Sequence, residues 1–247
     1  MKKAILITGA TSGVGKALAF ELAKRGYSMA LTGRRTDLLE MIQKEIKQVY
    51  PGQEVEIHAL DVTAYETIPP VVREMAEALG GLDIVFANAG VALDGKVGQG
   101  QFENAITTIE VNLLGAMATV DAATAYFLER GSGHIVATSS VAAFRGLPGH
   151  SSYCASKAGL STYLEALRTE VYQKNIDITV LHPGFIATPL NEMLPRRPFL
   201  IPAEKGAAII ARLIEKKAKS PTVPVFPWNL IRPLLRILPT GIIAKMK

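Results

Sequence analysis

Residues Ala4 to Arg25 read AILITGATSGVGKALAFELAKR, which is a short apolar run, then a turn with three glycines, then a helical pattern. A buried strand followed by a glycine turn and a helix is the first unit of a doubly wound α/β fold. Gly9, Gly13 and Gly15 would let the chain turn sharply and let backbone amides approach a pyrophosphate at the helix N-terminus. Similar turns also join strands to helices in proteins that bind no nucleotide, so this motif alone leaves both interpretations open.

The same alternation of short β-branched runs and longer amphipathic segments continues along the chain. It predicts a Rossmann-type parallel sheet of about seven strands, in the order 3-2-1-4-5-6-7, with helices on both faces. The predicted strands cover residues 4–8, 28–32, 54–60, 83–88, 133–139 and 176–181, with a weaker strand at 223–226. The longest predicted helices cover 101–129 and 152–173, and a proline-rich loop precedes a helix that starts near Ala203.

Composition indicates a globular chain with a single domain over residues 1–247. Hydrophobic residues make up 49% and charged residues 20%, which excludes a disordered or fibrous protein. One cysteine, Cys154, and four histidines without metal-ligand spacing predict no metal site and favour a reducing, cytoplasmic compartment. The net charge of +5 comes from dispersed Lys and Arg without a recognition motif, so we expect no nucleic-acid partner.

The residues after the second predicted strand indicate which nicotinamide cofactor would fit. Proteins that bind NAD place an acidic residue here, which bonds the adenosine ribose 2′-hydroxyl. This chain has Gly33 followed by Arg34 and Arg35, and two guanidinium groups suit the 2′-phosphate of NADP(H). Two solvated arginines at the end of a strand remain the alternative interpretation.

Tyr153 and Lys157 form the candidate catalytic pair. Their i, i+4 spacing on a predicted helix puts both side chains on one face, about 6 Å apart. A phenol titrates near a pKa of about 10 in water, so it needs a nearby cation to exchange a proton at neutral pH. Helices also carry such pairs by chance, but here Ser140 lies thirteen residues before Tyr153, at the end of the predicted fifth strand. That coincidence favours the catalytic interpretation.

Together these segments resemble the short-chain dehydrogenase/reductase family, in its short single-domain type, from Lys3 to about Ala218. The resemblance implies four catalytic residues: Asn112, Ser140, Tyr153 and Lys157. It also implies that NADP(H) contacts the glycine turn, several strand ends and the active-site helix. These residues are Gly9, Thr11, Ser12, Gly13, Val14, Gly15, Arg34, Arg35, Asp61, Val62, Asn88, Ala89, Gly90, Tyr153, Lys157, Pro183, Gly184, Ile186 and Thr188.

The implied reaction moves a hydride between the nicotinamide and a carbonyl carbon, while Tyr153 donates or accepts the proton at the oxygen that Ser140 holds. Lys157 would lower the pKa of Tyr153 and bond the nicotinamide ribose, and Asn112 would hold a water linking Lys157 to solvent. The alternative function is a catalytically silent NADP(H)-binding regulator or redox sensor on the same fold.

No motif names the substrate or the physiological direction of the reaction. Mostly apolar side chains are expected to surround a small-molecule carbonyl or alcohol, which favours a hydrophobic compound. They are Val91, Leu93, Ala142, Phe144, Leu147, Phe185, Met193 and Leu194. The predicted substrate loop, 189–202, adds Arg196 and Arg197, which either meet an anionic tail or are solvated.

Residues 221–247 extend beyond the resemblance and mix apolar and basic residues without a single acidic one. Arg232 and Arg236 interrupt the apolar run before the ~20 residues that a membrane helix requires. Two interpretations stay open: packing over the substrate loop or a second subunit, or peripheral contact with a membrane. The lipid-facing residues in the second case are Trp228, Ile231, Leu234, Leu235 and Leu238. The resemblance also implies a homodimer or homotetramer formed through the two longest helices.

Overall fold

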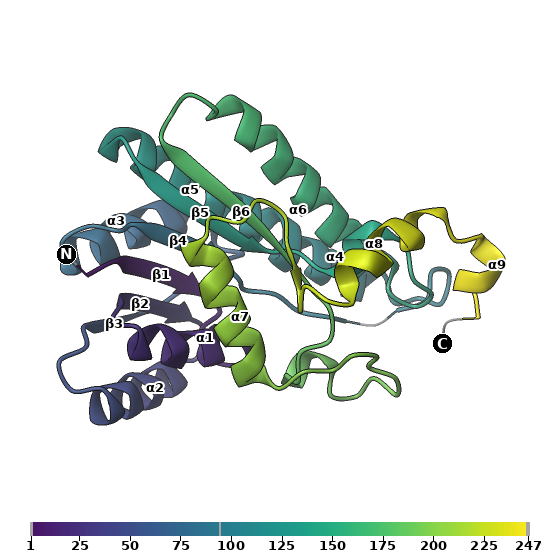
Figure 1. Ribbon diagram of the computed structural model, residues 1–247, viewed down its shortest axis with the longest axis horizontal. Helices are drawn as coiled ribbons and strands as arrows, with labels where there is room; N and C mark the ends of the chain where they lie inside the picture. Colours follow the sequence, from purple (N-terminus) through teal and green to yellow (C-terminus); the bar gives the residue numbers. More distant parts are fainter. Residues whose placement is uncertain (1, 94, 246–247) are drawn as a thin grey trace.

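The computed structural model describes residues 2–93 and 95–245 (Figure 1). Its parallel strands form one sheet in the order β3-β2-β1-β4-β5-β6-β7, which confirms the predicted order. The strands are β1 Ala4–Thr8, β2 Ser28–Gly33, β3 Val55–Ala59, β4 Ile84–Ala87, β5 Gly133–Thr138, β6 Ile176–Pro183 and β7 Thr222–Val223. Central strand β1 pairs with β2 on one side and β4 on the other, with Leu6 opposite Ala30 and Val85. The strand order therefore reverses beside β1, where open parallel sheets bind ligands at the carboxyl ends of their strands.

Helices cover both faces of the sheet, as the sequence predicts (Figure 1). One face carries α1 (Gly13–Lys24), α2 (Thr36–Val49) and α7 (Ala203–Glu215). The other carries α3 (Ile68–Ala78), α5 (Gly115–Arg130) and α6 (Ser151–Glu170). The remaining helical segments are η1 Tyr65–Thr67, α4 Phe102–Ile109, η2 Glu110–Leu114, η3 Val141–Phe144, η4 Pro189–Asn191, α8 Trp228–Ile237 and α9 Thr240–Ile243. Because both faces are covered, the central strands are buried on two sides, which explains their nearly continuous apolar sequences.

Two predicted elements differ from the structure. The predicted helix 101–129 is three consecutive segments, because a π-helical turn, η2, separates α4 from α5. The predicted strand 223–226 is wrong in its bounds, since β7 covers only Thr222–Val223. Pro224 follows directly and has no N–H to donate to β6, so the ladder ends there.

Residues 102–130 are long and apolar enough to cross a membrane by length and composition alone. Half of the qualifying window is buried, however, and α5 packs on α3 and on strands β4 and β5. Val120, Ala123 and Phe127 are fully or almost fully buried in that core. The helix is therefore a core element of the α/β layers.

Candidate functional site

Two adjoining cavities open at the carboxyl ends of the central strands. The larger one, here the glycine-loop cavity, has a volume of about 400 Å³ and extends from the turn after β1 to Tyr153 and Lys157 on α6. The smaller one, here the apolar cavity, has a volume of about 180 Å³ and lies between η3 and the loop after β6. Both cavities are lined by Val14, Thr138, Tyr153, Thr188 and Leu190. Tyr153 therefore stands where a ligand in one cavity would meet a ligand in the other.

The glycines of the first turn are required by close backbone contacts. Gly9 has a φ of +68°, and a Cβ there would lie 2.7 Å from the Cα of Ala89. A Cβ on Gly15 would collide with the carbonyl oxygen of Gly9. Thr8 joins the same two segments, because its Oγ1 accepts hydrogen bonds from the backbone N–H of Asn88 (3.0 Å) and Ala89 (3.2 Å). The turn after β1 and the end of β4 thus form one rigid wall.

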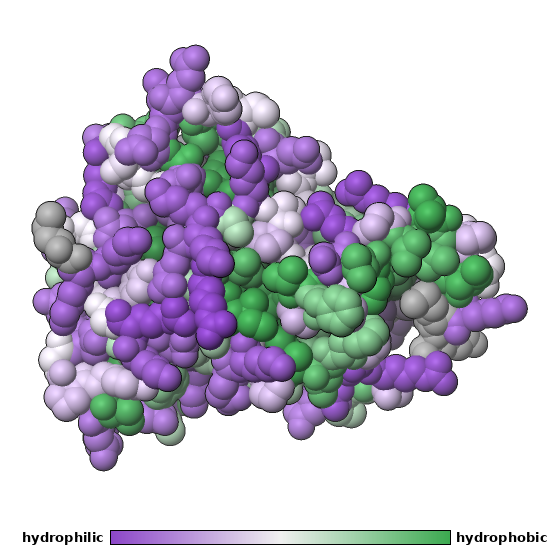
Figure 2. All heavy atoms as spheres, viewed as in Figure 1, coloured by the Kyte–Doolittle hydropathy of each residue, from purple (hydrophilic) through white to green (hydrophobic). Residues whose placement is uncertain are grey.

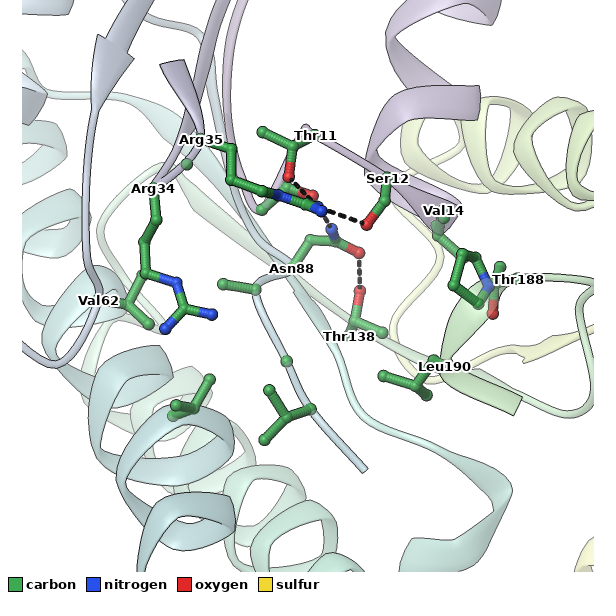
Figure 3. Close-up of a pocket in the computed structure, with 18 of the residues that line it drawn as sticks. Thr11, Ser12, Val14, Arg34, Arg35, Val62, Asn88, Thr138, Thr188 and Leu190 are labelled. Carbon is green, nitrogen blue, oxygen red and sulfur yellow. Dashed lines mark hydrogen bonds between the residues drawn. The ribbon is translucent and has the colours of Figure 1, made fainter. Parts of the chain in front are cut away.

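Two arginines, Arg34 and Arg35, and the residues where α1 begins line the glycine-loop cavity (Figure 3). Helix α1 begins at Gly13 without a side-chain cap, so the N–H groups of its first turn are free to bind an anion. Arg35 donates from Nη2 to Oγ1 of Thr11 (2.8 Å) and to Oγ of Ser12 (3.4 Å).

Arg34, the second arginine of the glycine-loop cavity, has only a weak ion pair within the chain. Nη1 of Arg34 lies 3.9 Å from Oδ2 of Asp61, and both side chains are well exposed, so the pair contributes little stability. Burial works to raise the pKa of Asp61, but hydrogen bonds from Thr63 and the charge of Arg34 hold it below its usual value. An anionic ligand could therefore replace Asp61 as the partner of the Arg34 guanidinium with little loss of stability.

Tyr153 and Lys157 lie together on α6, as their spacing predicts. Nζ of Lys157 is 5.8 Å from the centre of the Tyr153 ring and donates a 2.8 Å hydrogen bond to the carbonyl oxygen of Thr138. Burial lowers the pKa of Lys157 to about 8. Burial also raises the pKa of Tyr153, and a hydrogen bond with Ser140 offsets part of that rise, so the expectation that Lys157 lowers the pKa of Tyr153 is wrong for the protein without a bound cofactor. At neutral pH the pair is therefore a protonated phenol beside a lysine that is still largely cationic.

Asn112 is fully buried in the π-helical turn η2. Its Oδ1 accepts a hydrogen bond from the N–H of Val91, and its Nδ2 donates to the carbonyl oxygen of Val91, both at 2.8 Å. A Cβ on Gly90 would lie 3.1 Å from Oδ1 of Asn112 and 3.6 Å from Nζ of Lys157. Asn112 thus holds the wall beside the ammonium group, whereas the water that Asn112 is expected to hold, linking Lys157 to solvent, stays a prediction.

The predicted site residues divide between the two cavities. Those that line the glycine-loop cavity are Gly9, Thr11, Ser12, Gly13, Val14, Arg34, Arg35, Asp61, Val62, Asn88, Ala89, Gly90, Tyr153, Lys157 and Thr188. Ser140, Pro183, Gly184 and Ile186 line the apolar cavity instead. Gly15 and Asn112 line neither cavity, because each packs behind a wall that other residues form.

Sequence reasoning missed Thr138, which lines both cavities. Its Oγ1 donates to Oδ1 of Asn88 (3.1 Å), and its carbonyl oxygen receives the hydrogen bond of Lys157. Thr138 is the last residue of β5, directly before Ser139 and Ser140. Its place at a strand end was the available signal, but its main contact uses the backbone, which every residue type has.

The predicted substrate residues are partly corrected. Ala142, Leu147, Phe185 and Leu194 line the apolar cavity, Val91 lines the glycine-loop cavity, and Leu93 lines neither. Met193 is 93% exposed, because the turn that directs Leu190, Asn191 and Leu194 inward points it to solvent. Phe144 is buried outside the cavity, stacked on His182 with the guanidinium of Arg232 4.4 Å from its ring centre.

Helix α8 supports the wall of the apolar cavity. Trp228 is 6% exposed, and a Cβ on Gly184 would overlap its indole ring. The indole also lies 6.3 Å from the ring centre of Phe185 and 5.7 Å from that of Phe199 in the predicted substrate loop. Because Trp228 and Leu235 are buried within the chain, the orientation that places these two side chains against lipid is wrong. The predicted packing over the substrate loop is what these contacts form.

Residues 3–198 match the family model of the short chain dehydrogenases. An uncharacterized oxidoreductase of Mycobacterium tuberculosis is 36% identical over 239 residues, which are 96% of this chain and 94% of that protein. The NADP-dependent 3-hydroxy acid dehydrogenase of Schizosaccharomyces pombe is 36% identical over 188 residues, 75% of this chain and 72% of that protein. The structure of an alcohol dehydrogenase from the archaeon Thermococcus sibiricus, complexed with 5-hydroxy-NADP, has a TM-score of 0.80 and 29% identity, covering 90% of this chain and 96% of that one.

Proposed function

Because the chain belongs to the short-chain dehydrogenase family, we propose that it is an NADP(H)-dependent oxidoreductase that interconverts a carbonyl and an alcohol on a hydrophobic substrate. The observation that carries this proposal is the position of Tyr153, which lines both cavities and lies beside the buried Lys157. A proton donor at that boundary can act on a substrate in one cavity while a cofactor occupies the other.

The glycine-loop cavity has the donor groups that NADP(H) requires. Gly9 and Gly13, both with positive φ, let the backbone approach a pyrophosphate, and the N-terminus of α1 offers N–H groups to it. Arg34 and Arg35 suit the 2′-phosphate, whereas a ribose hydroxyl would call for an acidic residue here. When bound, NADPH supplies the hydride. The relative from S. pombe and the structure from T. sibiricus, whose names mention NADP, support the same cofactor.

Tyr153 acts as the general acid in reduction. Its raised pKa keeps the phenol protonated at neutral pH, so the O–H is available to the carbonyl oxygen. The positive charge of Lys157 stabilises the phenolate that forms when the proton leaves. Ser140 lines the apolar cavity beside Tyr153 and holds the carbonyl oxygen of the substrate by a hydrogen bond. In the direction of alcohol oxidation, Tyr153 accepts the proton instead.

The lining of the apolar cavity supports a hydrophobic substrate. Ala142, Leu147, Phe185 and Leu194 offer only apolar side chains, and Ser140 and Tyr153 bring polar groups to the reacting oxygen. A compound that carries one carbonyl on an otherwise apolar frame satisfies both sets of contacts.

The substitution Tyr153→Phe tests the proposed function. We expect kcat for NADPH oxidation with ketones, quinones, 3-oxoacyl thioesters or steroids to fall by about 10²–10⁴-fold, because the substitution removes the hydroxyl that donates the proton. The dissociation constant for NADPH, measured by fluorescence titration, should change little. Tyr163→Phe, on the same helix but outside both cavities, is the matched control and should retain activity.

Retained turnover in Tyr153→Phe would contradict the catalytic assignment. Wild-type protein that binds NADPH but turns over no carbonyl, and no alcohol with NADP, would instead favour the regulator.

We further propose a homo-oligomer that works in a reducing cytoplasm. Leu114 at the end of η2 and Leu128 in α5 are 41% and 48% exposed, which suits a contact between copies of the chain. Cys154 is a free, buried thiol whose pKa is raised by burial, in agreement with a compartment where disulfides are rare.

A further inference from the structure

Helix α8 carries apolar residues on two different faces. Trp228 and Leu235 are on the face buried against the chain. Leu230, Leu234 and Ile237 are 58%, 53% and 76% exposed, and their i, i+4, i+7 spacing aligns them in one stripe on the other face. The solvent side of a helix ordinarily carries polar residues. This stripe is apolar and is not covered within the part of the chain that the structure describes.

The exposed stripe is part of a larger surface. Figure 2 shows hydrophobic surface gathered over α8 and α9, with hydrophilic residues around it. The residues of this surface, here the tail patch, are Val225, Phe226, Leu230, Leu234, Ile237 and Ile242, which are between 45% and 76% exposed. Contiguous apolar patches rimmed by polar residues mark sites of interaction with another protein or a membrane.

The charge around the tail patch selects between these partners. Residues 221–247 contain four Lys or Arg and no acidic residue, so they supply most of the net charge of +5. Arg236 and Lys245 are exposed, although the guanidinium of Arg236 lies 5.8 Å from the ring centre of the buried Phe144, and Arg232 donates a 3.0 Å hydrogen bond to the carbonyl oxygen of Ser220. A partner that combines an apolar interior with an anionic surface complements both properties.

We propose that the tail patch docks on the surface of a bilayer that contains anionic phospholipids. The stripe of α8 would lie in the plane of the interface, with Leu230, Leu234 and Ile237 among the upper acyl chains and the cations at the phosphate groups. A symmetric contact between two copies fits less well, because it would bring the same cations of both copies together. The docking face is the side of α8 opposite to Trp228 and Leu235.

Sedimentation with vesicles tests the docking, and it needs neither cofactor nor turnover. Full-length protein is mixed with vesicles of phosphatidylcholine alone or of phosphatidylcholine with phosphatidylglycerol. We expect binding to the anionic vesicles, weakened by salt. The variant Leu230→Ser/Leu234→Ser/Ile237→Ser should lose at least about tenfold in partition coefficient, because each removed side chain takes several buried CH₂ groups with it.

A matched control removes equally exposed apolar residues elsewhere. Met41, Val49 and Tyr172 are 65%, 56% and 85% exposed and lie outside α8 and α9, so their triple replacement by Ser should leave binding unchanged. A second variant, Arg236→Gln/Lys245→Gln, retains the patch and should lose the preference for anionic vesicles. Circular dichroism confirms that each variant is folded.

Three outcomes would overturn the proposal. They are no binding of the wild-type protein to anionic vesicles, equal losses in both triple variants, and an unchanged lipid preference in the cation variant. If the wild-type protein does not bind vesicles and light scattering finds a smaller mass for the α8 variant than for the wild type, the tail patch is an interface between copies instead.

Discussion

Lys157 has an environment that few lysines share, because its ammonium group is buried and has the carbonyl oxygen of Thr138 as a hydrogen-bond acceptor. Burial disfavours the charged form, which brings the pKa of Lys157 down to about 8. The group therefore remains largely positive at neutral pH but loses its charge soon above it. In the proposed mechanism that loss removes the stabilisation of the Tyr153 phenolate. Burial thus shifts the pKa of both residues, upward for Tyr153 and downward for Lys157.

The two arginines after β2 lead to a prediction about cofactor preference. In Arg34→Asp/Arg35→Ala, two cations that suit a 2′-phosphate are lost and a carboxylate that suits a ribose hydroxyl is gained. We expect the ratio of kcat/KM for NADPH to that for NADH to fall at least about tenfold, since a single charge-assisted hydrogen bond contributes about 1.5–3 kcal/mol. Steady-state kinetics with both cofactors measures the ratio.

Arg34→Lys/Arg35→Lys is the matched control for this pair. It retains both charges, so NADPH should stay preferred. An unchanged preference in the Asp/Ala variant would mean that both arginines are only solvated at the strand end.

At the scale of elements, α8 is a short helix whose buried face supports the wall of the apolar cavity. Trp228→Ala would leave a cavity beside Gly184 and Phe185, and we expect a loss of about 3–5 kcal/mol in the free energy of unfolding. The KM for the carbonyl substrate should rise more than the KM for NADPH, since the lost support lies under the apolar cavity. Urea unfolding and initial rates measure these effects.

Leu230→Ala serves as the control on the same helix. Leu230 is 58% exposed, so its truncation should change stability by no more than about 0.5 kcal/mol. Equal destabilisation by the two substitutions would show that α8 does not depend on the packing of its indole.

At the scale of the whole molecule, a buried histidine in the sheet links stability to pH. His134 lies on β5, and its Nε2 is 2.9 Å from Oγ1 of Thr179 on β6. Burial lowers its pKa from 6.5 to about 4. In the range between these values the unfolded chain binds a proton that the folded chain does not, so stability falls as the pH falls from 6.5 towards 4.

The histidine contribution is measured by urea unfolding at pH 7.5 and pH 5. When the pH falls from 7.5 to 5, protonation of His134 in the unfolded chain should lower the free energy of unfolding of the wild-type protein by about 2 kcal/mol. His134→Gln can still bond Thr179 but cannot be protonated, so it should lose about 2 kcal/mol less than the wild type over the same interval. Identical losses in both proteins would mean that His134 does not titrate on unfolding.

The sequence predicted most strands within two residues, because both faces of the sheet are covered and each central strand is a continuous apolar run. The same reasoning failed at β7, where Pro224 stops the ladder, and across η2, where an α-helical pattern continues through a π-helical turn. Neither event changes the apolar periodicity. Both depend on individual hydrogen bonds, which periodicity does not report.

By itself the sequence determined the order of the elements, the glycine turn at the first strand, and the alignment of Tyr153 with Lys157. Each of these follows from local rules, since covalent spacing sets which residues share a helix face and glycine alone tolerates the turn. Only the tertiary structure decided what surrounds these groups, from the carbonyl oxygen of Thr138 at Lys157 to the two apolar faces of α8. Along the chain those faces look alike, and which of them is buried depends on the element packed opposite, which sequence spacing does not specify.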